Sequence, residues 1–388
     1  MDAYELIVIG SGPGGVAAAR AYTEAGGRGP VLLVTADQDT PYSRPPLSKE
    51  ALRSPDAPAH EPLVEEGGLD GVELRLSSPV SSVDMAAKRV RIGALEVAYE
   101  RLVLAPGSRP ALLPDLPSDA EFHVLRTVSD LRGLTEAAQH ARTAVVVGSG
   151  FIGCEAAASL AMRGLDVTVV SPEPGPQQQR LGDRCSAAIR SWLEEAGVHL
   201  HHDVEVSSIE APRRLNLSDG TTLEPDLVLL ALGAKPATDL LDGSGLRLDH
   251  GRVVVDSGMR ASVPDVYAVG DAALAHHPVA GRPVAVEHWG DAETMGEIAG
   301  RNAAGGSQQW DSVPGFWSEI GEHTLMYAAW GDGWDTVRVV EDGDAFTVWY
   351  GKEGTLVGVL AHENEDDYER GQQLIADGAA LDDAVPSR

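Results

Sequence analysis

Short apolar runs that end in glycine-rich turns recur along this chain. The run at residues 6–9 leads into the turn at 10–15, and the run at 144–147 leads into the turn at 148–153. An alanine-rich segment follows each turn. A short apolar run before glycine is typical of a buried strand, and an alanine-rich segment favours a helix. The pattern predicts two strand–turn–helix units of one kind.

The same pattern continues beyond these two units. Apolar runs at 101–105 and 227–231 each end near a further glycine turn, so one architecture occurs twice in the chain. Beyond residue 306, β-rich runs separated by Gly and Asp predict a small antiparallel domain with a short helix near 368–375. The segment at 299–306, rich in Gly, Ala and Asn, is typical of a linker. We expect an α/β fold with two Rossmann-like dinucleotide-binding domains and a small C-terminal α+β domain.

Both glycine turns have the G-x-G-x-x-G spacing of a dinucleotide-binding loop. The first glycine makes the turn, the second lets the backbone approach a pyrophosphate, and the third lets the helix pack on the strand. The phosphates then lie at the positive end of the helix, where free N–H groups point at them. Two such turns predict two bound dinucleotides and electron transfer between them. The residues assigned to this role are Gly10, Gly12, Pro13, Gly14 and Gly15, and Gly148, Gly150, Phe151, Ile152 and Gly153.

Charge and composition exclude several classes of partner. The 388-residue chain has a formal net charge of −29, so like charge repels nucleic acid and anionic membranes. From residue 306 onward, 17 Asp and Glu stand against 4 Lys and Arg, which we interpret as a solvated acidic surface. No apolar run approaches the ~20 residues of a membrane span. A strand that starts by residue 5 leaves no room for a cleaved signal, so with two cysteines we expect a cytoplasmic protein.

A resemblance to a known family rests first on residues 41–49, Pro-Tyr-Ser-Arg-Pro-Pro-Leu-Ser-Lys. They resemble the P-Y-x-R-P-P-L-S-K signature of the FAD- and NAD(P)H-dependent ferredoxin reductases, which serve oxygenases and bacterial P450 systems and are related to apoptosis-inducing factor. Residues 105–107, 150–155, 268–271 and 314–318 stand at the family's A-T-G, second turn, A-V-G-D and F-W-S motifs. The resemblance covers essentially the whole chain. It implies a glutathione-reductase-like arrangement, with an FAD domain at 1–108 and 236–305, an NAD(P)H domain at 109–235 and a C-terminal reductase domain at 306–388.

The resemblance also implies which residues contact FAD. Arg44 and Lys49 match positions beside the diphosphate and the electron-rich ring, which suits cations there. Asp271 matches the acid that hydrogen-bonds the ribityl chain, and Trp289, next to His288, lies in the stretch that runs along the flavin ring. The remaining candidates are Asp37 for the adenosine ribose, with Val80, Ala105, Gly107 and Arg126 as peripheral contacts.

Two residues of the NAD(P)H site, Glu155 and Ser171, bear on catalysis and on the choice between NADH and NADPH. In relatives the acid at Glu155 pairs with the lysine at Lys49 beside the hydride-accepting nitrogen of the flavin, so both are catalytic candidates. The alternative for Glu155 is an acid in the first turn of a helix, favoured by the dipole. Ser171 stands where relatives carry an acid for the NADH ribose, so Arg180 or Glu173 would select the nucleotide, and we favour NADH over NADPH. The residues assigned to this site beyond the second turn are Glu155, Ser171 and Gly233.

Cysteine and histidine positions exclude other chemistries. Cys154 and Cys185 are the only cysteines, and neither lies near residues 42–49, where a redox-active thiol would stand. Disulfide reduction is therefore not expected. The adjacent pairs His201-His202 and His276-His277 lack the spacing of metal ligands, so we predict surface histidines and no metal site.

The function predicted from these residues is a flavoprotein reductase. It would pass electrons from NAD(P)H through FAD to a ferredoxin-type iron–sulfur protein, able to feed a P450 or a dioxygenase. The alternatives are an NAD(P)H oxidase or quinone-type reductase, and a nucleotide-sensing binding module like apoptosis-inducing factor. Trp317 is a candidate wall of the electron exit path, and Arg44 with Arg53 a candidate basic patch for an acidic ferredoxin. The sequence leaves open a monomer or a homodimer.

Overall fold

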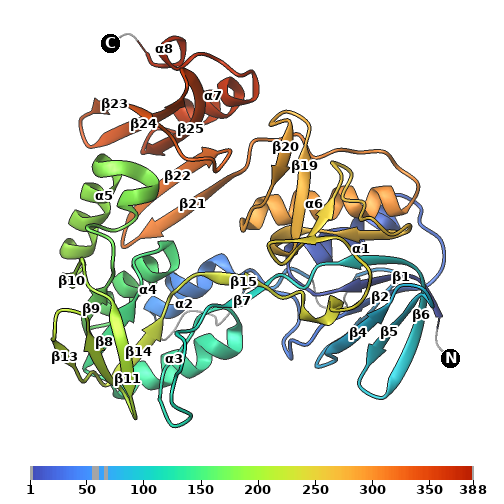
Figure 1. The fold of residues 1–388 in the computed structure, drawn as a ribbon, viewed down its shortest axis with the longest axis horizontal. Coiled ribbons are helices and arrows are strands. Elements are labelled where there is room, and N and C mark those ends of the chain that lie inside the picture. The colour runs from blue at the N-terminus through green and yellow to red at the C-terminus, as the bar shows by residue number, and fades with distance from the viewer. Residues whose placement is uncertain (1–2, 55–60, 65–68, 387–388) are drawn as a thin grey trace.

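The computed structural model describes residues 3–54, 61–64 and 69–386. Figure 1 shows three regions: one in blue and light orange that combines the start of the chain with a later segment, a green one beside it, and a C-terminal one in dark orange and red that is packed against the green. None of the helices that the structure describes has the length and apolar character needed to cross a membrane. The predicted α/β class with an antiparallel C-terminal domain is confirmed.

The first region is a mostly parallel sheet built from two distant parts of the chain. Strand β1 (Ala3–Ile9) pairs in parallel with β2 (Val31–Val34) and β6 (Leu95–Leu104), and β18 (Val266–Ala268) joins the sheet on β6. In sequence, β18 comes after the whole second region, yet it pairs with β6, which comes before that region. Residues from both segments therefore pack into one core. The other strands here are β3 (Val72–Arg75), β4 (Val80–Asp84) and β5 (Arg89–Ile92), with β16 (Leu248–Asp249), β17 (Arg252–Val255), β19 (Ala273–His277) and β20 (Arg282–Val284) in a smaller sheet.

Two helices of this region, α1 (Pro13–Glu24) and α6 (Trp289–Ala303), cross at very short range. A Cβ at Gly300 would lie 2.2 Å from the carbonyl oxygen of Ala18, so only glycine lets the two backbones approach this closely. The prediction of a linker at 299–306 is therefore wrong for its first half. The small residues there form the end of α6 and serve helix packing.

The second region repeats the plan as a parallel sheet in the order β10-β9-β8-β14. Its helices are α3, α4 and α5, and α5 is interrupted by Gly182, whose φ is +80°. The bounds are β8 (Thr143–Val147), β9 (Asp166–Val170), β10 (Val198–His201), β14 (Leu227–Leu230), α3 (Val128–His140), α4 (Phe151–Met162) and α5 (Gln178–Glu195). A side sheet holds β11 (Val206–Glu210), β12 (Arg214–Leu217) and β13 (Thr222–Leu223), and β7 (Ser108–Pro110) pairs with β15 (Ala234–Pro236) where the chain crosses between regions.

The third region is an antiparallel sheet in the order β21-β22-β25-β24-β23. The β-rich runs expected beyond residue 306, at 336–340, 345–350 and 355–361, are its last three strands along the chain, whereas its first two were not predicted from the sequence. Buried residues of this sheet, such as Leu325 and Tyr350, share one core with Leu181 and Trp192 of α5. The bounds are β21 (Gly315–Ile320), β22 (His323–Ala329), β23 (Thr336–Asp342), β24 (Ala345–Lys352), β25 (Thr355–His362), α7 (Glu365–Ala376) and α8 (Leu381–Ala384).

Candidate functional site

Both glycine turns line one cavity, which has a volume of about 1190 Å³. The third region closes one side of it with Phe316 and Trp317 of β21. Of the predicted site residues, Gly148 and Ser171 lie outside its lining. The structure brings the others together around it: Gly10, Gly12, Pro13, Gly14, Gly15, Asp37, Arg44, Lys49, Val80, Ala105, Gly107, Arg126, Gly150, Phe151, Ile152, Gly153, Glu155, Gly233, Asp271 and Trp289.

The two glycine turns share one backbone geometry. The first glycine of each has a positive φ, +106° at Gly10 and +111° at Gly148. A Cβ on the last glycine would collide with the carbonyl oxygen of the first, at 1.9 Å for Gly15 and 2.1 Å for Gly153. Steric exclusion therefore requires glycine at these positions, and it leaves the helix N-terminus open for a phosphate. Gly148 has this structural role behind the cavity wall.

The middle of the two turns differs. A Cβ at Gly14 would lie 2.7 Å from the carbonyl oxygen of Ala292, so α6 covers the first turn. The corresponding position in the second turn is Ile152, whose side chain is 45% exposed. The first turn is therefore enclosed, which suits a resident ligand, and the second is open, which suits a ligand that comes and goes.

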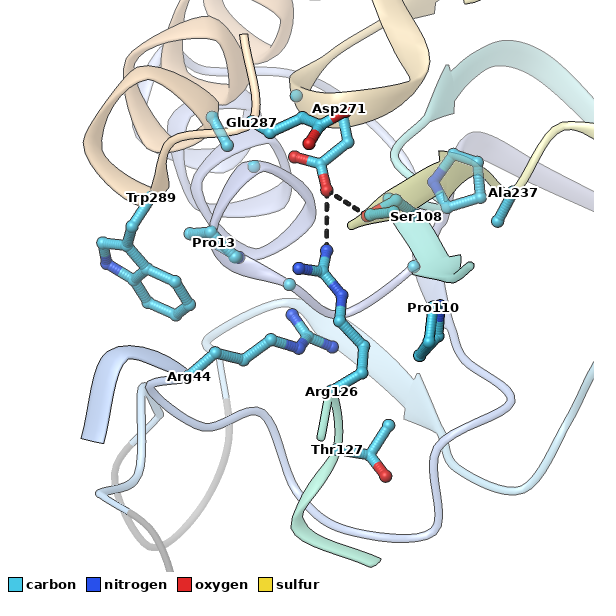
Figure 2. A pocket seen from close by; sticks show the side chains of 18 of the residues that line it. Pro13, Arg44, Ser108, Pro110, Arg126, Thr127, Ala237, Asp271, Glu287 and Trp289 are labelled. Atoms are coloured by element: carbon cyan, nitrogen blue, oxygen red, sulfur yellow. Dashed lines mark hydrogen bonds and ion pairs between the residues drawn. The ribbon is translucent and has the colours of Figure 1, made fainter. Parts of the chain in front are cut away.

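Arg44 faces the first turn (Figure 2). Its Nη1 lies 2.8 Å from where a Cβ of Gly12 would stand, and its guanidinium lies 5.3 Å from the ring centre of Tyr42. Its Nε has no hydrogen-bond partner in the part of the chain that the structure describes, and burial lowers the pKa of the guanidinium. A guanidinium stays charged at neutral pH, so it requires an anion here. The pyrophosphate of FAD fits both the cradle and the cation.

Asp271 gathers the polar groups at the next part of the wall, where Figure 2 shows Arg126 and Ser108 converging on it. Its Oδ2 accepts hydrogen bonds from Nη2 of Arg126 at 2.7 Å and from Oγ of Ser108 at 2.6 Å. A buried carboxylate of this kind can accept from the hydroxyls of a ribityl chain. Asp37 also lines the cavity, where the Tyr42 hydroxyl donates to it at 2.7 Å, and its contact with a ribose stays a prediction.

A buried ion pair lines the same cavity as the two turns. Lys49 follows the short helical turn Pro45–Ser48, and its Nζ lies 3.0 Å from Oε2 of Glu155, with side-chain exposures of 8% and 5%. Glu155 lies beyond the first turn of α4, so the helix-dipole alternative does not describe its position. Its carboxylate also accepts from the hydroxyls of Ser48 at 2.5 Å and Ser318 at 2.6 Å. These two serines were not predicted from the sequence.

Ser171 ties the end of β9 to the second turn instead of facing the cavity. It is 1% exposed, its Oγ lies 2.7 Å from Oγ of Ser149, and it accepts from the N–H of Glu173 at 3.2 Å. The expectation that Ser171 contacts the nucleotide therefore finds no support in this geometry, because its hydroxyl is already engaged in the core. Gln177, which the sequence did not single out, lines the cavity next to the second turn.

Five Lys and Arg side chains line the described part of the cavity, and two of them stack on aromatic rings without a carboxylate partner there. Arg44 is one of these. The other is Arg180 of α5, whose guanidinium lies 5.7 Å from the ring centre of Phe151 and 5.5 Å from that of Phe316. Each glycine turn thus has one arginine available for an anion. The three ion pairs are Lys49–Glu155, Arg126–Asp271 and Arg252–Glu287.

Trp317 stands at the mouth of the cavity with 49% of its surface exposed. The predicted basic patch of Arg44 and Arg53 is not formed. Arg44 faces the cavity, and Arg53 pairs with Glu319 of β21 at 3.1 Å and donates to the backbone oxygen of Gly321, just beyond that strand. Trp289 begins α6 at the cavity wall.

Thiols and histidines take structural positions. Cys154 and Cys185 are buried and not in a disulfide, and burial raises the pKa of both thiols, that of Cys185 to about 12. The surface prediction is wrong for His277, which is buried with its ring 4.7 Å from that of Trp310 and 4.9 Å from that of Trp330, because alternate residues of β19 face the core. Among the described residues, no group of three His, Cys, Asp or Glu is placed to hold a metal ion.

Comparison with known proteins agrees with this geometry. Residues 4–296 match the family described as pyridine nucleotide-disulphide oxidoreductase. The chain belongs to that family. Residues 315–386 match a second model, described as the reductase C-terminal domain, which covers the antiparallel third region. The resemblance to ferredoxin reductases predicted from the sequence motifs is therefore confirmed.

Several known proteins are similar to this chain over most of its length. Rhodocoxin reductase of Rhodococcus erythropolis is 32% identical over 96% of this chain and 89% of its own length. Apoptosis-inducing factor 3 of Mus musculus is 31% identical over 97% of this chain, which spans 64% of that protein. The solved ferredoxin reductase for the CYP199A2 system of Rhodopseudomonas palustris is 28% identical, with a TM-score of 0.91 over 98% of this chain and 97% of that one.

Proposed function

We propose that this protein is an FAD-dependent NAD(P)H:ferredoxin oxidoreductase. The observation that carries the proposal is that two dinucleotide turns line one shared cavity, one turn covered by α6 and one exposed, with the buried Lys49–Glu155 pair in the wall of that cavity. The chemistry that a bound FAD would supply is acceptance of a hydride from nicotinamide and release of the electrons one at a time. The chain's own residues bind the two nucleotides, exclude water and hold the charges that this transfer requires.

The residues divide this work between them. The first turn and Arg44 would hold the pyrophosphate of FAD, and Asp271 would accept from its ribityl hydroxyls. Lys49 and Glu155 form a buried pair with no net charge in the wall of the shared cavity, so they orient the nicotinamide without adding net charge to the site. This assignment of roles is supported by the shared cavity and by the family's signature at residues 41–49.

The proposed acceptor is an iron–sulfur protein of the ferredoxin class, able to supply a P450 or a dioxygenase. A ferredoxin reductase is among the most similar solved structures, and a ferredoxin cluster takes one electron at a time. The two cysteines are buried and are not joined in a disulfide, so they do not form a redox-active pair. This supports electron transfer directly from FAD to the acceptor. Trp317, exposed at the cavity mouth, suits the exit path.

NADH is the proposed donor. Glu173, three residues beyond Val170 at the end of β9, places a carboxylate near the end of the strand, which would repel the 2′-phosphate of NADPH. We also propose a cytoplasmic location, which the presence of only two cysteines, not paired in a disulfide, supports. Separating cell fractions and blotting for the protein tests the location.

The test of the proposed function is a steady-state assay with purified holoprotein, NADH or NADPH, a [2Fe–2S] ferredoxin and cytochrome c. We expect NADH-dependent reduction of cytochrome c that requires the ferredoxin, with kcat/KM higher for NADH. Oxygen consumption at the same rate without ferredoxin would indicate an oxidase instead. Slow reduction with a lasting long-wavelength absorbance band would indicate a nucleotide-sensing module, and a tenfold preference for NADPH would contradict the donor.

A further inference from the structure

Glu155 receives hydrogen bonds from two other regions of the molecule. Its Oε2 accepts from Ser48 at 2.5 Å and Lys49 at 3.0 Å, both in the first region. Its Oε1 accepts from the hydroxyl of Ser318 at 2.6 Å and the N–H of Glu319 at 3.3 Å, both in β21 of the C-terminal domain. Each oxygen of this carboxylate is therefore held by a different region, while Glu155 itself belongs to the second.

Strand β21 delivers Ser318 to this point as a rigid element. It pairs with β22 along its whole length, and successive side chains of a strand point to opposite faces. Trp317 is accordingly 49% exposed at the cavity mouth, whereas Ser318 is 1% exposed. The serine hydroxyl therefore has a fixed direction toward Glu155.

We propose that Ser318 is a positioning residue for hydride transfer, which holds the Glu155 carboxylate in a fixed orientation against Lys49. The inference rests on the proposed function. Without the Ser318 hydroxyl, Oε1 would keep only the longer contact to the Glu319 N–H, so the buried carboxylate would lose its strongest donor on that side. The carboxylate would then rotate, and Lys49 would lose its fixed place at the cavity wall. The C-terminal domain is thus part of the hydride-transfer site and not only a surface for the electron acceptor.

Three variants of the FAD-loaded protein test this role. Ser318→Ala removes the hydroxyl, and Ser318→Thr keeps it. Thr347→Val is the matched control, because Thr347 is fully buried in the same sheet, donates to Asp367 at 2.9 Å and does not line the cavity. Stopped-flow mixing with NADH separates the limiting rate constant of flavin reduction from the apparent Kd for NADH.

We expect the limiting rate constant to fall about tenfold in Ser318→Ala, the change that one lost hydrogen bond to a charged group produces, with the apparent Kd within about threefold of wild type. Ser318→Thr should recover the rate to within about threefold of wild type, and Thr347→Val should leave it unchanged. A rate for Ser318→Ala within about twofold of wild type overturns the inference. A slow Ser318→Thr, or an equally slow Thr347→Val, also overturns it, because both point to a structural role alone.

A second readout needs no turnover. In urea unfolding, Ser318→Ala should lower the midpoint less in the Glu155→Gln background than in the wild-type background, because the contact to the charged oxygen is already lost there. Equal shifts in both backgrounds contradict a direct interaction. If the wild-type protein is not reduced by NADH at all, the proposed function fails and the role of Ser318 in hydride transfer fails with it, while this cycle still reports the contact.

Discussion

Replacing Arg180 with glutamine tests whether the second glycine turn binds the phosphates of a nicotinamide dinucleotide. The guanidinium stacks on Phe151, the first residue of α4, and on Phe316, without a carboxylate partner among the described residues. A hydrogen bond between charged groups contributes about 1.5–3 kcal/mol. Arg180 is exposed to solvent, so screening places the effect at the lower end, at about 1.5 kcal/mol. The Kd for NAD⁺ should therefore rise about tenfold.

The assay is calorimetric titration of the oxidised holoprotein with NAD⁺ and with ADP-ribose, which carries the pyrophosphate without nicotinamide. Both ligands should lose affinity equally in Arg180→Gln. Arg184→Gln is the control, because Arg184 lies on the same helix but pairs with Glu341 at 2.6 Å and stacks on Phe346, away from the cavity lining. A Kd for Arg180→Gln within about twofold of wild type would refute the reasoning. An equal loss of affinity in Arg184→Gln would show that the effect comes from the overall charge and not from a direct contact with the ligand.

Three other predictions follow from the same geometry. Arg44→Gln should raise the Kd for FAD at least about tenfold, measured by the fluorescence of released FAD, because the unpartnered guanidinium faces the first turn; an unchanged Kd would contradict this. Gly153→Ala should abolish reduction by NADH and retain FAD, because its Cβ would lie 2.1 Å from the carbonyl oxygen of Gly148; equal loss of FAD would count against separate sites. Burial lowers the pKa of His277 from 6.5, and its Nδ1 accepts from the N–H of Ala280, so the folded state favours the neutral ring. The contribution of His277 to stability is then present above pH 6.5 and is lost as pH falls, because the unfolded chain takes up the proton first. The thermal unfolding midpoint should therefore drop on acidification, and it should drop less steeply in His277→Phe. The same dependence of the midpoint on pH in both proteins would refute the assignment.

The parts of the site that follow from local rules could be predicted from the sequence. The requirement for glycine at Gly15 and Gly153 is a steric consequence of a strand turning directly into a helix, so the motif alone identifies it. Lys49 and Glu155 are 106 residues apart, and no spacing rule joins them. Their pairing came from the resemblance to a family, and the structure places the two charges in contact.

The parts that could not be predicted depend on contacts between distant residues. Ser318 reaches Glu155 across 163 residues, and a serine in a strand carries no signal of such a partner. The end of α6 has a composition typical of a linker, and only the presence of α1 against Gly300 explains why a helix forms there. The burial of His277 likewise follows from the register of β19, which short polar pairs in the sequence do not reveal.

The central claim is that a dinucleotide at the open turn reduces FAD at the enclosed turn, which then serves a one-electron acceptor. An anaerobic titration of the holoprotein with NADH, followed by a [2Fe–2S] ferredoxin, tests it most directly. We predict that one equivalent of NADH bleaches the flavin band, and that two equivalents of ferredoxin are then reduced as the band returns, since each cluster takes one electron. A flavin band that NADH does not bleach, or a bleached band that ferredoxin does not restore, would contradict the account.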